Sequence, residues 1–199
     1  PIFKAFGAKL TFLEIVRHPL YMIKQQTINM RDLNIENPRD VDLYMNYNGS
    51  IIPYYAIGWE EKFISSNIVE KAIYNIENIY ELNKIKRSNL NKEKSYKILT
   101  IPFEKFVINP DNYLLNILTL LKTEFSSKTK KILSKQKIPR NKIADGINLP
   151  IYKRFLWEPS IKNLSEKDEL LKRRKWAIDM GANKQSVETL DRISEDYES

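Results

Sequence analysis

The stretch from Lys9 to Met30, KLTFLEIVRHPLYMIKQQTINM, constrains the fold more than any other part of the sequence. Over Leu10–Val16 apolar side chains alternate onto both faces of a predicted strand, which is typical of the covered interior of a mostly parallel sheet. Pro19 then suits the first position of a helix. The apolar stripe of that helix consists of Leu20, Ile23, Thr27 and Met30. The stretch therefore predicts a strand, a short turn and a helix.

The remaining sequence predicts one hairpin, a second strand and several helices. Asn48-Gly49 lies between two apolar runs and is the signal of a two-residue β-hairpin turn. A second buried strand is predicted over Tyr96–Ile101. Helices are predicted at about 67–87, 110–121, 126–137, 165–180 and 184–197, with Gly181 as the cap after the fourth of them. The fold class expected is α/β, with a parallel sheet, flanking helices and a helix-rich C-terminal half.

The helix after the second strand has clear boundary signals. Asn109 is the predicted N-cap and Pro110 the first helical residue. Its predicted buried stripe consists of Leu114, Ile117, Leu118 and Leu121. One domain is expected over residues 1–199, because 199 residues with 42% hydrophobic side chains suffice for one core.

Composition narrows the chemistry. There is no cysteine and only one histidine, His18, so disulfides, thiolate metal sites and His-rich zinc sites are not expected. A cysteine-free chain suits a reducing compartment, and we expect a cytoplasmic protein with no bound metal. No apolar run approaches the roughly 20 residues that a membrane-spanning helix needs. The net charge of +8 attracts anions but does not choose among phosphate, nucleic acid and lipid.

Arg17 is the first candidate binding residue. It follows the predicted strand directly, and the turn between a strand and a helix lies at the ligand-binding edge of an open α/β sheet. A guanidinium at that edge offers five donors in a fixed geometry to a phosphate. The alternative use of the same arginine is an ion pair with a carboxylate.

Two motifs in this order resemble the C-terminal half of cytosolic-type sulfotransferases. VRHPLYMIKQ, with Arg17, stands where that family has an Arg-x-Pro motif, and IPFEKFVINP, with Glu104, stands where it has a Glu-containing strand end followed by a helix. The segment GWEEKFISSNIVEKAIYNIENIYELN is similar to the region between these landmarks. The resemblance covers about residues 8–125 and depends on order and spacing.

The resemblance implies a P-loop-like α/β fold that binds 3′-phosphoadenylyl sulfate as a co-substrate. In the family, the arginine that ends the strand and a serine on the next helix hold the 3′-phosphate. Arg17 matches the arginine, Gln25 stands at the serine position, and Glu104 matches a glutamate whose role we take as structural. A basic loop near the C-terminus of the family closes over the nucleotide, and the residues on the corresponding loop here are Arg140, Lys142, Lys153 and Arg154.

The glycine-rich loop that cradles the sulfate in the family has no counterpart in this sequence, nor does its catalytic histidine. Two explanations are open: a unit preceding Pro1 supplies them, or the chain is a non-catalytic relative. The function expected is sulfuryl transfer to a hydroxyl or amine acceptor, with this chain carrying the 3′-phosphate-binding half and with its enzymatic activity left open. The competing hypothesis is a basic protein that binds nucleic acid or an anionic surface, based on the lysines between Lys122 and Lys142.

Overall fold

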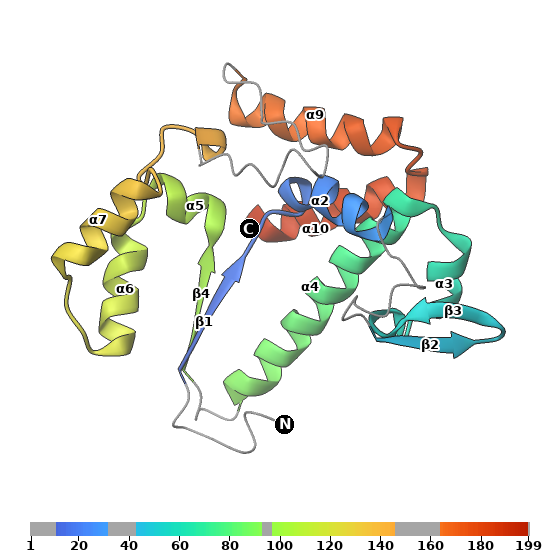
Figure 1. The fold of residues 1–199 in the computed structure, drawn as a ribbon, viewed down its shortest axis with the longest axis horizontal. Coiled ribbons are helices and arrows are strands. Elements are labelled where there is room, and N and C mark those ends of the chain that lie inside the picture. Colours follow the sequence, from blue (N-terminus) through green and yellow to red (C-terminus); the bar gives the residue numbers. More distant parts are fainter. Residues whose placement is uncertain (1–10, 32–42, 93–96, 146–163, 199) are drawn as a thin grey trace. The chain divides into compact units, whose positions relative to one another are not determined.

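The computed structural model describes residues 11–31, 43–92, 97–145 and 164–198 (Figure 1). Contacts within the chain divide it into two compact units, each built from two segments. The first unit comprises Pro1–His18 and Leu82–Glu169, and the second comprises Pro19–Glu81 and Leu170–Ser199. The division falls within two helices and immediately after the first strand and its turn, and the prediction of one domain stays a prediction.

The first unit contains a two-stranded parallel sheet. Strand β1 (Thr11–Val16) pairs with β4 (Lys97–Pro102), in a register that runs from Thr11 opposite Lys97 to Val16 opposite Pro102. The two strands lie side by side and point the same way (Figure 1). The prediction that these two segments are neighbouring parallel strands is confirmed, and the α/β class with flanking helices is confirmed with it.

Glu14 is the one charged side chain in β1, and the sheet accommodates it with two partners. Thr100 lies directly opposite on β4 and donates its hydroxyl to the Glu14 carboxylate at 2.9 Å. Arg87 of α4 (Ile68–Lys92) places its Nε 3.5 Å from the same carboxylate. These contacts explain how an acidic residue is held in a strand whose neighbours are apolar.

The expectation that β1 is covered on both faces is wrong for one face. Leu13 is 42% exposed and Ile15 is 65% exposed, whereas Phe12 and Val16 on the other face are half-buried. Among the described residues β4 is the only strand paired with β1, so the sheet is too narrow to enclose both faces. The apolar pattern of a strand predicts which of its faces are hydrophobic. It does not predict how many neighbouring strands and helices are present to cover those faces.

Helices α5 (Phe103–Ile108), α6 (Asp111–Leu121) and α7 (Ser127–Lys135) follow β4. Helix α5 is not predicted by the sequence. Because it ends at Ile108, Asn109 caps the end of α5 and Pro110 is the N-cap of α6, which corrects the predicted boundary by one residue. The prediction that the apolar stripe of α6 is buried is also wrong. None of its side chains is fully buried, and Leu121 is 48% exposed.

The second unit begins with α2 (Pro19–Arg31) and contains a hairpin of β2 (Tyr44–Tyr47) and β3 (Ser50–Pro53). Asn48 and Gly49 both have positive φ angles, 49° and 83°, as a two-residue hairpin turn requires. The hairpin prediction is confirmed. The chain continues through the short helices η2 (Tyr54–Ala56) and α3 (Glu60–Ser65) into α4.

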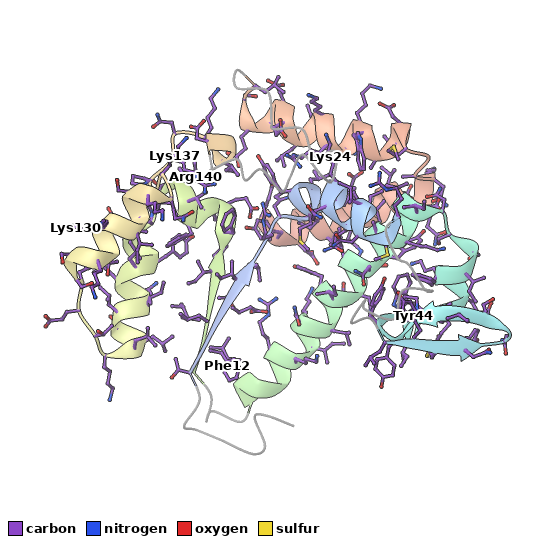
Figure 2. The ribbon with its side chains drawn as sticks, viewed as in Figure 1. Phe12, Lys24, Tyr44, Lys130, Lys137 and Arg140 are labelled. Atoms are coloured by element: carbon purple, nitrogen blue, oxygen red, sulfur yellow. The ribbon has the colours of Figure 1, made fainter. Side chains whose placement is uncertain are left out.

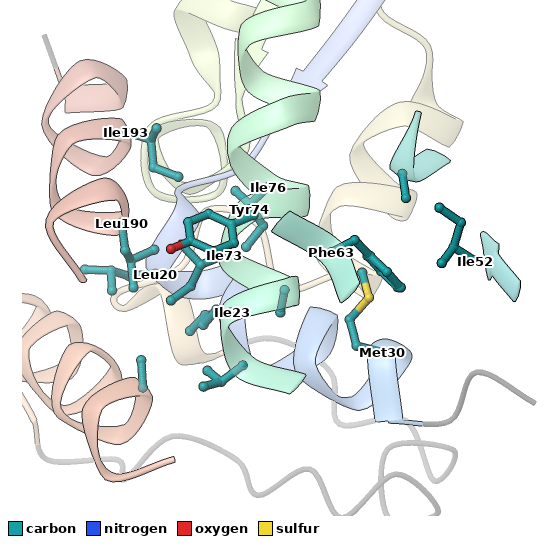
Figure 3. Close-up of a cluster of buried hydrophobic side chains, with 14 residues drawn as sticks. Leu20, Ile23, Met30, Ile52, Phe63, Ile73, Tyr74, Ile76, Leu190 and Ile193 are labelled. Atoms are coloured by element: carbon teal, nitrogen blue, oxygen red, sulfur yellow. The ribbon is translucent and has the colours of Figure 1, made fainter. Parts of the chain in front are cut away.

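The hydrophobic core of the second unit joins α2 and α4 to α9 (Glu166–Asp179) and α10 (Lys184–Glu198) (Figure 3). Ile23, Ile73 and Leu190, from three of these helices, are completely buried. All four residues of the predicted stripe of α2 are buried, which confirms that stripe. Gly181, two residues after the end of α9, has a φ of 96°, as expected for a glycine that caps a helix.

Glu70 ties together the first turns of α4 and α10. Its carboxylate accepts hydrogen bonds from the backbone N–H groups of Asn67, at 3.0 Å, and Asn183, at 3.2 Å. The Asn67 side chain in turn accepts the Glu70 backbone N–H at 3.0 Å. The arrangement satisfies free donors at the start of two helices with one side chain that is only 7% exposed.

We expect Glu70→Ala to lower the free energy of unfolding by about 2 to 3 kcal/mol, because two backbone donors lose a charged acceptor. Urea denaturation followed by circular dichroism measures this. The matched control is Glu188→Ala, whose carboxylate is 65% exposed and lies 3.8 Å from Lys184, and it should cost less than about 0.5 kcal/mol. Equal effects of the two substitutions would show that Glu70 does not join the helices.

Candidate functional site

The parallel register brings two chain segments to the same edge of the β1–β4 sheet. Val16 lies opposite Pro102, so Arg17 follows one strand and Phe103 and Glu104 follow the other at the same end. This is the carboxyl edge of the two strands, where open parallel sheets bind their ligands. The candidate site is built on it.

Glu104 is the centre of this edge. Its side chain is buried, and its two oxygens accept hydrogen bonds from Arg17 Nε at 3.2 Å and from the His18 backbone N–H at 3.0 Å. The carboxylate therefore fixes the turn after β1 to the residues after β4. The His18 N–H, directly before the first residue of α2, is thereby engaged by Glu104.

Phe103 is shared by two arginines. The guanidinium carbon of Arg17 lies 4.7 Å from the centre of the Phe103 ring, and that of Arg140 lies 5.8 Å from it. Both distances are within the range of a cation–π contact. The Arg17 side chain is 44% exposed, and within the described part of the chain its two terminal nitrogens have no hydrogen-bond partner.

Arg140 is held in place by hydrogen bonds to two backbone carbonyls, and none of its described hydrogen bonds runs to a carboxylate. Its N–H donates to the Val107 carbonyl at 2.8 Å, and its Nη1 donates to the Ile143 carbonyl at 3.1 Å. The Arg140 Nε is buried and has no partner among the described residues. Burial lowers the pKa of the Arg140 guanidinium, and the charge of Arg17 lowers it further, while Asp145 offsets this in part.

These contacts define an arginine pair, Arg17 and Arg140, on one aromatic ring with one buried carboxylate between the strand ends. Two like charges raise the energy of the ligand-free site, and a buried donor without an acceptor adds to it. An oxyanion near the exposed nitrogens would relieve both. The site is suited to bind a phosphate or sulfate group.

The other predicted site residues differ in where they lie. Lys142 is exposed, its backbone N–H donates to Asp145, and its Nζ donates to the Leu164 carbonyl at 3.3 Å. Gln25 belongs to the second unit, and its amide donates to Asn29 at 3.0 Å. Lys153 and Arg154 lie outside the described residues. The joint role predicted for these residues stays a prediction.

An open pocket of about 520 Å³ adjoins Glu104 in the first unit. Its lining is mixed polar and aromatic and consists of Glu104, Lys105, Ile108, Asn109, Asn112, Tyr113 and Glu166. Amide and ammonium groups therefore lie beside Glu104 together with a second carboxylate, that of Glu166, and neither Arg17 nor Arg140 lines the pocket.

Phe103 is the site residue that the sequence reasoning missed. Its position directly after the second strand and next to Glu104 is the only signal in the sequence, and nothing in that position indicates which cations meet there. Arg140 is 37 positions away in the sequence, so its contact with Phe103 depends on the course of α6 and α7.

Comparison with family models, curated proteins and solved structures yields no match to this chain. Within the described residues there is no group of three or more metal-binding side chains. Nor does this part of the chain contain a helix long and apolar enough to cross a membrane.

We expect Arg140→Met to leave the free energy of unfolding of the ligand-free protein unchanged, or to raise it by up to about 1 kcal/mol. Methionine removes a repelled charge and a donor, Nε, that has no partner among the described residues, which offsets the loss of the hydrogen bond to the Ile143 carbonyl. Chemical denaturation in chloride buffer measures this. A loss of more than about 1 kcal/mol would mean that the guanidinium serves the fold and not a ligand.

Proposed function

We propose that the arginine pair binds a phosphate group of a nucleotide and that the chain is a sulfotransferase-like protein using 3′-phosphoadenylyl sulfate as co-substrate. The observation that carries the proposal is the buried Arg140 Nε, which has no acceptor among the described residues, beside a second guanidinium on the same ring. A fold that keeps two arginines in this state without a ligand suggests that an anion completes the site.

The order of the elements supports the nucleotide over a simple anion. Arg17 ends a parallel strand whose chain continues through Pro19 into a helix, and Glu104 follows the neighbouring strand. This matches the order and spacing of the sulfotransferase motifs that the sequence resembles. In this proposal the remainder of the nucleotide occupies the pocket that adjoins Glu104.

Each residue has a defined role in this proposal. Arg17 presents its two terminal nitrogens to the phosphate while its Nε stays on Glu104. Arg140 supplies a second positive charge, and both guanidiniums contact the Phe103 ring. Glu104 is a positioning residue, because its carboxylate holds Arg17 and the turn and repels a phosphate itself. The co-substrate carries the sulfuryl group that is transferred to a hydroxyl or amine.

We expect Arg17→Ala to weaken binding of 3′-phosphoadenosine 5′-phosphate by about ten- to a hundredfold, the value of one charge-assisted contact. Binding of adenosine 5′-phosphate, which lacks the 3′ group, should scarcely change. Isothermal titration of both nucleotides against both proteins measures the difference.

The matched control is Arg87→Ala, which removes the same charge from the same unit but from a residue that contacts Glu14. It should affect neither nucleotide. Equal losses for the two nucleotides with Arg17→Ala, or no loss for either, would make Arg17 a structural ion-pair residue. A chain that binds the 3′-phosphate nucleotide selectively and transfers no sulfuryl group to any acceptor would be the non-catalytic relative.

A further inference from the structure

The net positive charge of this protein comes almost entirely from one stretch of the sequence. Residues 112–144 contain eight lysines and arginines and a single acidic residue, Glu124, whereas the rest of the chain contains 25 basic and 24 acidic residues. A net charge of +7 out of +8 therefore lies in about a sixth of the sequence. A general bias toward lysine codons would spread the charge, so this concentration calls for a local explanation.

Helix α7 presents three of these eight basic residues on one face. Lys128, Lys131 and Lys135 are spaced by three and four residues, which aligns them along one side of the helix. All three are exposed, and Thr129 and Leu133 on the opposite side are half-buried. Within the described part of the chain none of the three lysines has an ion-pair partner. Lys130, on another side of α7, and Lys137, past its end, are also exposed (Figure 2).

Apolar side chains are exposed beside the lysines. Ile132 follows Lys128 by one helical turn and is 60% exposed. Leu121 at the end of α6 and Phe125 in the connection to α7 are 48% and 45% exposed. Large apolar groups exposed next to a continuous lysine face are costly in water and are common where a protein meets a membrane interface.

We propose that the α6–α7 hairpin, residues 111–135, docks on the surface of a bilayer that contains anionic lipid. The lysine face meets the lipid phosphates and carboxylates, and Leu121, Phe125 and Ile132 enter the boundary between headgroups and acyl chains. The charge complementarity selects an anionic surface. The aliphatic side chains favour lipid over nucleic acid, because Leu121 and Ile132 offer no stacking surface to a base and gain nothing from a phosphate backbone.

The proposal is independent of the nucleotide site, because none of the lysines on α7 contacts the arginine pair in the described contacts. Full-length protein is tested by flotation with vesicles of phosphatidylcholine alone and with added phosphatidylserine. We expect binding only to the anionic vesicles. The triple variant Lys128→Gln, Lys131→Gln, Lys135→Gln should bind them about a hundredfold more weakly, from about fivefold per lysine. The double variant Phe125→Ser, Ile132→Ser should lose about tenfold at unchanged charge.

Two controls match these variants. Lys172→Gln, Lys175→Gln and Lys184→Gln together remove the same charge from exposed positions of the second unit, and Leu171→Ser removes an apolar side chain that is 54% exposed there. Both should bind anionic vesicles within about threefold of the unaltered protein. Circular dichroism confirms that each variant is folded, which is expected because every substituted position is exposed.

Three outcomes would overturn the proposal. The first is no binding to the anionic vesicles. The second is an equal loss in the α7 triple variant and in its control, which would indicate an unspecific effect of net charge. The third is tighter binding to a single-stranded oligonucleotide than to vesicles, with no effect of Phe125→Ser and Ile132→Ser, which would assign the lysine face to nucleic acid.

Discussion

The hydrogen bonds to the Glu104 carboxylate are the interaction on which the candidate site depends. They join residues that are 86 and 87 positions apart, and they do so at the one edge where two parallel strands end together. A buried carboxylate needs partners, and here both of its oxygens are used, one by a side chain and one by the backbone of the turn. Because Arg17 is held through its Nε, the rest of its guanidinium is fixed in direction and still exposed. The same contact that stabilises the turn therefore presents a cation to solvent in a defined geometry.

Arg140 is in an electrostatically unfavourable position in the ligand-free protein, because it lies near a second guanidinium and its Nε has no described hydrogen-bond acceptor. The described hydrogen bonds of Arg140 run to the backbone carbonyls of Val107 and Ile143 and not to Glu104. Phe103 offers only the weak attraction of an aromatic ring, which two cations share. Sites that bind anions are commonly less stable when empty, since the groups that attract the ligand repel one another without it. The affinity of the site for an anion therefore follows from the positive charge that its own residues do not neutralise.

The basic residues of the first unit lie in two different environments, one partly buried and one exposed. Arg17 and Arg140 are partly buried, stacked on a ring and fixed by hydrogen bonds, which suits recognition of one anion with a definite shape. The lysines of α7 are exposed point charges on one helix face, beside apolar side chains, which suits an extended surface and not a single ligand. The net charge of the protein does not distinguish the arginines of the pair from the lysines of α7. Their burial and their neighbours separate a binding site from a docking surface.

The local elements were determined by the sequence itself. Asn48-Gly49 requires a hairpin turn, Pro19 begins a helix, Gly181 ends one, and the stripe of α2 specifies its buried face, because each of these signals acts over a few residues of backbone. The parallel pairing of the two strands also followed from their pattern. Tertiary structure alone decided that Arg17 meets Glu104, that Phe103 lies under two guanidiniums, that the Leu13 and Ile15 side chains stay exposed, and that the chain forms two units. These features depend on contacts between residues distant in the sequence, and a periodic pattern carries no information about which distant residue will supply the neighbour.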